Sequence, residues 1–357
     1  MDRRAFLRTG AAVGAVGLAG CLGGFETEQV GQPPIPEDRP DGVYVPSHVE
    51  GMAMVGTARE GDYAFGLTYS YAHRFWNVVG DETSLTAVGE EDDVHLMASV
   101  WDPETGRVLP ETGLSTAIYR DGELVTQEAI YPMLSQPMGF HYGANFGLAG
   151  DGDYTVELSV GAVPTRKTGS FRGRFDEPVT VELPFSYSRA DRDEIDFEIT
   201  PDDEAATPGA VSRMEMEMLP DSRAPAVGEL PGNVRGTVES DDAVLAVTVL
   251  DEPPAGVDGD GQYLAVSART EHNRMLIPAM GLRGRLRRDG DTVFDGRLRR
   301  TLDPNLAYHY GAVVDGVESG DELELSVTVQ PQTARHEGYE TAFGGVSGPM
   351  PDATLTL

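Results

Sequence analysis

Cysteine and lysine are almost absent from this chain. Its 357 residues include one cysteine, Cys21, and one lysine, Lys167. A single cysteine excludes a disulfide within the chain and any metal site built from several thiolates. Exported proteins often gain stability from disulfides, so this chain must rely instead on core size, salt or bound ligands.

Positive charge is scarce as well. The chain has 59 acidic residues against 27 lysines and arginines, giving a net charge of −32 and a pI of about 4.4. Such a surface has no basic patch to neutralise phosphates, so we expect no nucleic-acid partner. Dense carboxylates with almost no lysine are typical of halophilic archaeal proteins, which stay soluble in concentrated salt because salt screens their self-repulsion.

Long hydrophobic runs are missing too. The apolar run at residues 11–20 is too short to span a bilayer. It follows Arg3-Arg4 and ends in Leu18-Ala19-Gly20-Cys21, which together resemble a twin-arginine lipoprotein signal. We therefore expect residues 1–21 to be this signal, with lipid on the Cys21 sulfur anchoring the protein to the outer face of the cell membrane. Residues 22–42, rich in Gly, Pro and acidic residues, read as a disordered tether.

The rest of the chain contains an internal repeat. His141-Tyr142-Gly143-Ala144 recurs 168 residues later as His309-Tyr310-Gly311-Ala312. Several shorter matches share this offset without gaps, including Arg120-Asp121-Gly122 with Arg288-Asp289-Gly290. A constant register of this kind indicates two tandem domains of one fold. We place the domains at 43–188 and 209–357, with an acidic linker at 189–208.

Each copy alternates apolar and polar residues, and no stretch of the mature chain keeps a helical period for three turns. Tyr154–Val160 and Leu323–Val329 show the alternation clearly, and Asp-Gly pairs mark hairpin turns between such runs. We therefore predict an all-β fold of two tandem, immunoglobulin-like antiparallel β-sandwiches.

Histidine and methionine gather in the first copy. His95 and Met97 lie two residues apart on an expected strand, so their side chains share a face. Met133 and Met138 each follow a proline in the loop leading to the strand of His141. Thioether sulfur with imidazole nitrogen suits copper in either oxidation state and, less selectively, iron or zinc. The competing interpretation is that methionines fill gaps in the core and His141 bonds to a backbone group.

This pattern resembles the periplasmic iron-uptake family of copper-binding, immunoglobulin-like proteins. Pro132-Met133, then His141-Tyr142-Gly143-Ala144-Asn145, then Gly152-Asp153-Tyr154 follow that family's M-P-M, H-Y-G-x-N and G-x-Y motifs in order. His95-Leu96-Met97-Ala98 stands where the family has H-L-E-A. The resemblance implies that His95, Met133 and His141 are metal ligands in a protein supporting iron transport, with a metal permease as partner.

The chain departs from the family in its remaining ligands. Met97 replaces the family's glutamate, and residues 165–169 lack its last histidine. His48 or His73 would have to replace that histidine, with Met97 and Met138 as further candidates. His336-Glu337 is similar to the missing segment, but it belongs to the second copy and serves only if the domains touch.

The second copy indicates that the fold does not require the candidate ligands, because it lacks most of them. At the 168 offset His95 becomes Tyr263 and Met133 becomes Thr301, while His141 keeps a counterpart in His309. We find no nucleophile elbow, zinc-protease motif or phosphate loop, so we expect a binding protein and not an enzyme. The alternative function is a surface adhesion or spacer module without a small ligand. The identity of the metal, copper or iron, and the oligomeric state stay open.

Overall fold

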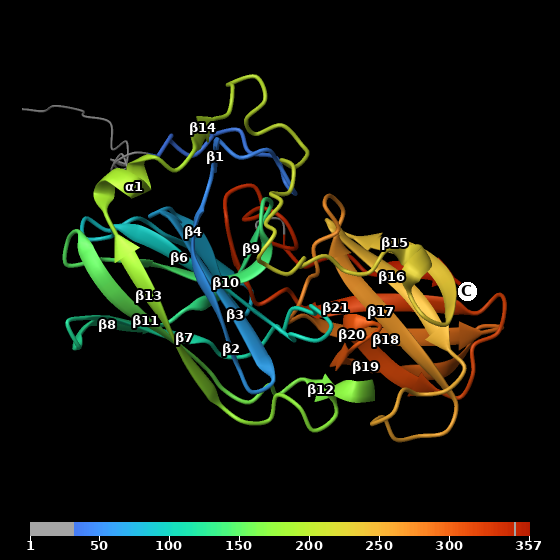
Figure 1. Ribbon diagram of the computed structural model, residues 1–357. Helices are drawn as coiled ribbons and strands as arrows, with labels where there is room; N and C mark the ends of the chain where they lie inside the picture. Colours follow the sequence, from blue (N-terminus) through green and yellow to red (C-terminus); the bar gives the residue numbers. More distant parts are fainter. Residues whose placement is uncertain (1–31, 346–347) are drawn as a thin grey trace, which may run out of the picture.

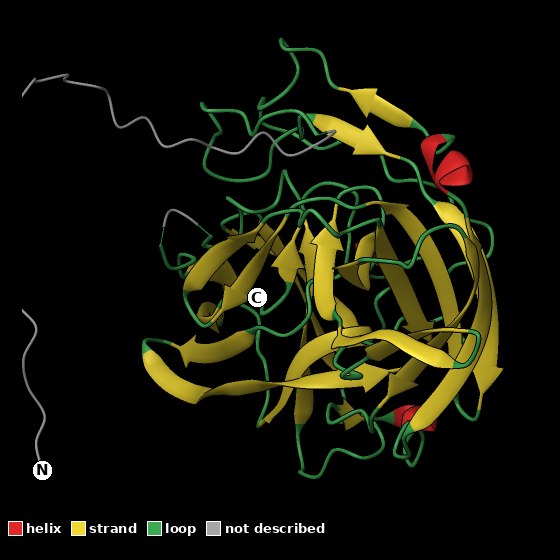
Figure 2. Ribbon diagram, turned by 90° about the vertical axis from the view of Figure 1, so that its left-hand side faces the viewer, coloured by secondary structure: helices red, strands yellow, loops and turns green. Residues whose placement is uncertain are grey.

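The computed structural model describes residues 32–345 and 348–357, which form two β-sandwiches side by side (Figure 1). The prediction of an all-β, sandwich-type fold is confirmed. Helical structure in the described ranges amounts to α1 (Arg189–Asp193) and the 3-10 turns η1 (Gly169–Phe171) and η2 (Val227–Glu229), and the helices drawn in Figure 2 lie outside the sheets. None of these helices is long and apolar enough to cross a bilayer. Arg3, Arg4 and Cys21 lie outside the described residues.

The first sandwich has an eight-stranded sheet facing a four-stranded one. The larger sheet has the order β2-β3-β6-β10-β9-β22-β4-β5. Its strands are β2 (Ala53–Glu60), β3 (Tyr63–Tyr71), β4 (Phe75–Val79), β5 (Glu82–Thr86), β6 (Val94–Trp101), β9 (Tyr131–Ser135), β10 (Gly139–Phe146) and β22 (Ala334–Arg335). The smaller sheet, β13-β11-β7-β8, consists of β7 (Ser115–Arg120), β8 (Glu123–Ala129), β11 (Gly152–Val160) and β13 (Val179–Tyr187).

The second sandwich is one folded-over sheet of nine strands. It consists of β12 (Arg166–Lys167), β15 (Asn233–Ser240), β16 (Ala243–Leu250), β17 (Gln262–Thr270), β18 (Gly281–Arg288), β19 (Asp291–Asp303), β20 (Ala307–Val314), β21 (Glu322–Val329) and β23 (Ala353–Thr356). The long strand β19 joins the two layers, because its first part pairs with β18 and its last part with β20.

The two sandwiches repeat each other strand by strand. β8 and β9 together match β19 at the 168 offset, and the same β-bulge occurs at Met54/Gly56 and at Val234/Gly236. The bulges are 180 residues apart, so the first copy has extra residues between its bulge and β6. The hairpin β4–β5 accounts for them, since no described strand of the second copy corresponds to it.

Each sandwich lends a short strand to the other. Arg166 and Lys167 of β12 pair in parallel with Thr301 and Leu302 of β19. Ala334 and Arg335 of β22 pair in parallel with Met133 and Leu134 of β9, at the same 168 offset. The exchange is reciprocal, and it carries His336 of the second copy into the first sandwich.

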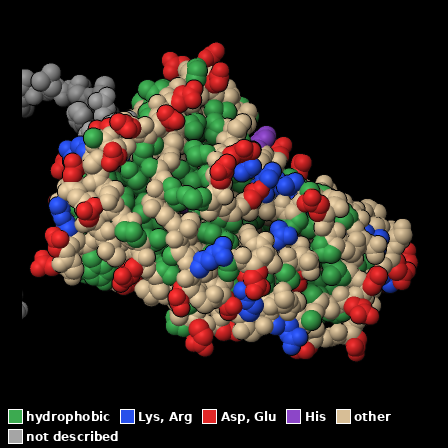
Figure 3. Space-filling model, viewed as in Figure 1, with side chains coloured by type: hydrophobic (Ala, Val, Ile, Leu, Met, Phe, Trp, Pro, Cys, Tyr) green, Lys and Arg blue, Asp and Glu red, His purple; other side chains and the backbone are tan. Residues whose placement is uncertain are grey.

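The segment predicted as a linker, 189–208, covers one end of the first sandwich. It contains α1 and β14 (Phe197–Ile199), and β14 pairs with β1 (His48–Glu50). Alternating apolar side chains of both sandwiches merge into one buried core. The acidic side chains spread over the visible surface (Figure 3), as expected when the apolar strand faces are used inside.

Candidate metal centre

A cluster of three buried histidines and one half-buried histidine, His336, lies where β6, β9, β10 and β22 meet. His95 is on β6, His141 is on β10 directly opposite Met133 of β9, and His336 follows β22. His73 precedes β4, the strand on the other side of β22. Sheet pairing brings segments that are distant in sequence within about 5 Å of each other. These histidines are therefore neighbours in space.

The four rings form one connected group in which His336 contacts the other three. The His73 and His95 rings are stacked with centroids 4.0 Å apart, and the His336 ring lies 4.7 Å from His73 and 5.1 Å from His141. One ligand nitrogen from each of His73, His95 and His336 falls within 4.8 Å of the others. The His95 and His141 rings lie 5.6 Å and 5.1 Å from the His336 ring, so a histidine of the second copy connects them.

Hydrogen bonds fix the imidazole tautomers. Nδ1 of His95 lies 2.7 Å from Asn145 Oδ1, Nδ1 of His141 lies 3.0 Å from the Gly139 carbonyl, and Nδ1 of His73 lies 3.0 Å from Glu50 Oε2. Each of these partners is an acceptor, so each Nδ1 carries the proton and each Nε2 keeps a lone pair. Histidine ligands of metals are oriented by acceptors in this way.

The lone pairs have no partner. Within the described residues, Nε2 of His73, His95, His141 and His336 is buried and makes no hydrogen bond. Burying a polar atom unpaired costs about 1–3 kcal/mol. Four such atoms on rings of one cluster need an ion or water to satisfy them, which fits a metal site.

Gly143 leaves space beside these atoms. A Cβ built on Gly143 would lie 2.6 Å from His95 Nε2 and 3.0 Å from Met133 Sδ. An imidazole nitrogen and a thioether sulfur therefore face one cradle that a single methyl group would fill. This donor set suits copper.

Burial keeps the cluster neutral. It lowers the pKa of His141 to about 4 and lowers the pKa values of His95 and His336 well below the usual range, with neighbouring histidines adding to the effect. Metal ligands must be deprotonated, and these histidines are prepared for that role.

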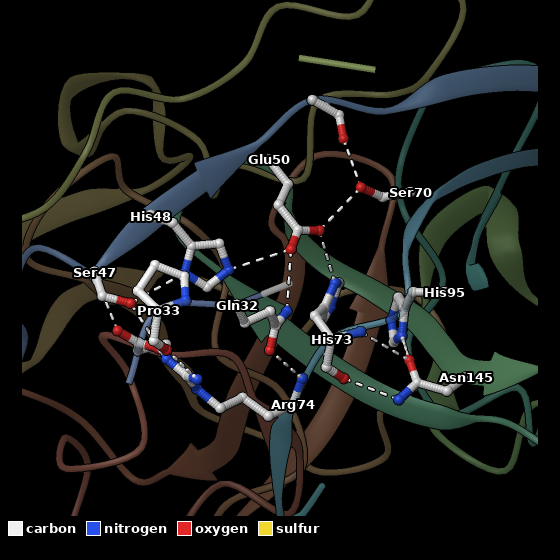
Figure 4. A network of polar contacts seen from close by, with 12 residues as sticks. Gln32, Pro33, Ser47, His48, Glu50, Ser70, His73, Arg74, His95 and Asn145 are labelled. Atoms are coloured by element: carbon white, nitrogen blue, oxygen red, sulfur yellow. Dashed lines mark hydrogen bonds and ion pairs between the residues drawn. The ribbon is translucent and has the colours of Figure 1, made fainter. Parts of the chain in front are cut away.

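Glu50 supplies the carboxylate that the sequence seemed to lack. Burial raises its pKa, but His73 and His48 outweigh this and hold the pKa below its usual range. Its Oε1 lies 3.2 Å from His48 Nε2, and Gln32 Nε2 donates to the same oxygen at 3.1 Å (Figure 4). The sequence named His73 as a possible replacement for the family's last histidine, but Glu50, which lies on β1, was missed.

The other predicted residues lie around the cluster or away from it. His48 stands beyond Glu50, stacked on Phe197 with ring centroids 5.1 Å apart. Met97 is buried and lines the same pocket as His73 and His336. Met138 lines a separate pocket and is not brought to the histidines.

The second copy holds a fixed cation at the equivalent place. Arg166 of β12 donates to Tyr263 Oη at 2.7 Å and to Thr301 Oγ1 at 2.8 Å, the residues that replace His95 and Met133. His309 Nε2 is satisfied by Tyr263 Oη at 3.1 Å, whereas its counterpart His141 has no such partner. An arginine stays charged and repels a metal cation. Among its described residues the second sandwich therefore offers no metal site at this position, whereas the first sandwich has imidazole and thioether donors there.

His309 is buried with both ring nitrogens hydrogen-bonded, and this makes the fold sensitive to acid. Burial lowers its pKa to about 4, against about 6.5 in the unfolded chain. The unfolded chain therefore binds a proton first, and stability present above pH 6.5 is lost as the pH falls toward 4. We expect wild-type protein to lose about 2 kcal/mol more unfolding free energy than His309→Gln between pH 7 and pH 5. Denaturant titrations at both values measure this, and equal losses would contradict it.

Comparison with known proteins found a matching family model and solved structures of low sequence identity. No curated protein sequence matches the chain. A copper-bound FetP variant of uropathogenic Escherichia coli is 19% identical with a TM-score of 0.30, covering 38% of this chain and 97% of that one. FetP of the same uropathogenic strain, in its recombinant as-isolated form, is 18% identical, with a TM-score of 0.30 and coverage of 40% and 96%. Copper-reconstituted P19 of Campylobacter jejuni is 17% identical, with a TM-score of 0.31 and coverage of 38% and 96%.

The family model covers most of both sandwiches. The model of a domain of unknown function, DUF7350, matches residues 49–168 and 228–355. The first segment contains His73, His95, Met133 and His141, and the second contains His336. Because these segments make up more than half of the sequence, the chain belongs to the DUF7350 family.

Proposed function

We propose that this protein binds one copper ion in the histidine cluster and serves the acquisition of iron or copper outside the cytoplasm. His95, Met133, His141 and His336 are the proposed ligands, and His73 is a fifth donor held by Glu50. One observation carries the proposal: four imidazoles of one connected cluster each have a buried Nε2 atom without a hydrogen-bond partner among the described residues.

A purely structural role explains the cluster poorly. Core histidines normally satisfy both ring nitrogens, as His309 does through Ala307 and Tyr263. Four unpaired nitrogens would cost several kcal/mol with no return in packing. A bound cation removes that cost, and neutral imidazoles accept it without first losing protons.

The donor types favour copper over harder ions. Imidazole binds copper, zinc and iron, whereas the thioether of Met133 favours copper, above all Cu(I). Glu50 stands behind His73, where a negative charge favours a nearby cation. Iron remains the proposed cargo of the transport process, with copper as the resident ion.

The proposed location rests on the sequence signals. Arg3-Arg4 and Cys21 would export the folded protein and anchor it by lipid to the outer face of the membrane. A metal permease in the same membrane is the proposed partner. In this role the protein binds and hands over metal and performs no catalysis.

Copper titration of metal-free protein tests the proposal. We expect one equivalent of Cu(II) to bind to protein purified without a metal-affinity tag, and His141→Ala to weaken that binding. His309→Ala is the matched control, because His141 and His309 are both buried and both bond Nδ1 to the carbonyl two residues earlier. Absence of bound copper in the wild type, with no thermal shift, would favour the adhesion or spacer role.

A further inference from the structure

A methionine-rich segment lies between the two sandwiches. Residues 214–218 read Met-Glu-Met-Glu-Met, and we call them the methionine segment. Figure 1 shows the chain after β14 descending beside β9 toward this junction. The backbone N–H of Met214 donates to the Pro137 carbonyl at 2.9 Å, which ties the segment to the β9–β10 turn.

The methionine segment walls a pocket. Met214 and Met216 line it from one side and Met138 from the other, with Glu215 and Glu217 at the same pocket. Met275 lies behind it, since its Sδ is 3.8 Å from Ser222 Oγ, a further lining residue. Methionines from two distant parts of the chain therefore line one opening.

This pocket adjoins the histidine cluster. Ser99 of β6 lines it, and Met97, two residues earlier on the same face of the strand, lines the pocket that contains His73 and His336. On β9 and its turn, Pro137 belongs to the histidine pocket and Met138 to the methionine pocket. Two residues along a strand span about 7 Å, so the two pockets are neighbours.

Packing alone does not account for these methionines. Leu219 packs on Gly66, so this leucine holds the segment against the sheet. Met218 is 55% exposed, and Met214 and Met216 are half-buried, whereas core methionines such as Met350 are buried. Flexible thioethers at a partly open pocket are accessible to a ligand.

We propose that Met138, Met214 and Met216 form a second metal site, selective for Cu(I), that loads the histidine cluster. Neutral thioethers bind Cu(I) and discriminate against Fe(II), Zn(II) and Cu(II), which prefer nitrogen or oxygen donors. Arg213, which also lines the pocket, is paired with Glu215 at 3.8 Å, so the Glu217 carboxylate is the one that offsets the single positive charge. The site itself stands apart from the proposed function, and its loading role rests on that function.

Cu(I) stoichiometry in the full chain tests the site. Under anaerobic, reducing conditions with a competing Cu(I) chelator, we expect two equivalents in the wild type. Met214→Leu/Met216→Leu, which conserves volume, should bind one, and His95→Ala/His141→Ala should also bind one. X-ray absorption of the histidine-disabled variant should show sulfur neighbours only, and Met350→Leu is the control that keeps two equivalents.

Failure of the methionine site and failure of the histidine cluster give different Cu(I) stoichiometries. If the leucine variant retains two equivalents, or the histidine-disabled variant binds no Cu(I), the methionine site is rejected whatever the cluster does. If the wild type binds one equivalent that the leucine variant loses, the methionine site stands and the cluster fails. For loading, stopped-flow transfer of Cu(I) to the cluster should slow at least tenfold in the leucine variant, and an unchanged rate would overturn that role.

Discussion

Replacing His336 by alanine is expected to abolish tight copper binding, although the change lies in the second copy. The β22 exchange places His336 within 5.6 Å of the His95 ring and 5.1 Å of the His141 ring, with its Nε2 unpaired. Loss of an outer-shell partner weakens metal binding about 10–100-fold, so loss of a direct ligand should cost more than about 100-fold. Competition titration with a chelator of known affinity measures the change.

His272→Ala is the control for this experiment, since His272 also belongs to the second copy but has no contact with the cluster rings among the described residues. It should leave copper affinity unchanged. Copper affinity within threefold of wild type in His336→Ala would place the ion away from the junction. The cluster would then have to work with first-copy residues alone.

Gly143→Ala is expected to weaken copper binding at least tenfold while leaving every proposed ligand residue unchanged. The new methyl would lie 2.6 Å from His95 Nε2 and 3.0 Å from Met133 Sδ, closer than side-chain atoms normally approach. It would therefore occupy the space in front of both donors. We expect an affinity loss of at least tenfold, which corresponds to about 1.4 kcal/mol.

Gly316→Ala provides the comparison, because a Cβ there meets nothing within 4 Å. Circular dichroism and thermal melts of both variants separate blocked binding from loss of fold. If Gly143→Ala folds and binds copper with wild-type affinity, the ion does not sit between His95 and Met133. That result would also remove Met133 from the proposed ligand set.

The internal repeat explains why one chain has a single such cluster. The two copies exchange equivalent strands, so both junctions have the same backbone plan. At one junction the side chains are histidines and a methionine, and at the other Arg166 provides the positive charge. The inserted β4–β5 hairpin then places His73 beside the first junction alone. The two junctions thus share one backbone arrangement but carry different side chains.

Local patterns were enough for the fold and for part of the candidate site. Alternation of period two and Asp-Gly turns fix strands and hairpins because each strand buries one face, and the confirmed sandwich fold follows from them. Met133 was predicted in a loop before the strand of His141, whereas it lies on β9 directly opposite His141, because a hairpin sets the register between its two strands. The 168-residue offset revealed the repeat before any coordinates.

Tertiary structure decided the remaining ligands. His336 is more than 190 residues from His141, and its position depends on how two sandwiches exchange strands, which local periodicity does not encode. Glu50 and His73 likewise meet through β1 and an inserted hairpin that have no counterpart in the repeat. Composition and periodicity predicted the candidate side chains and most of the strands that carry them. Long-range pairing alone decided which of their nitrogens were buried together without partners, because burial depends on everything that packs around an atom.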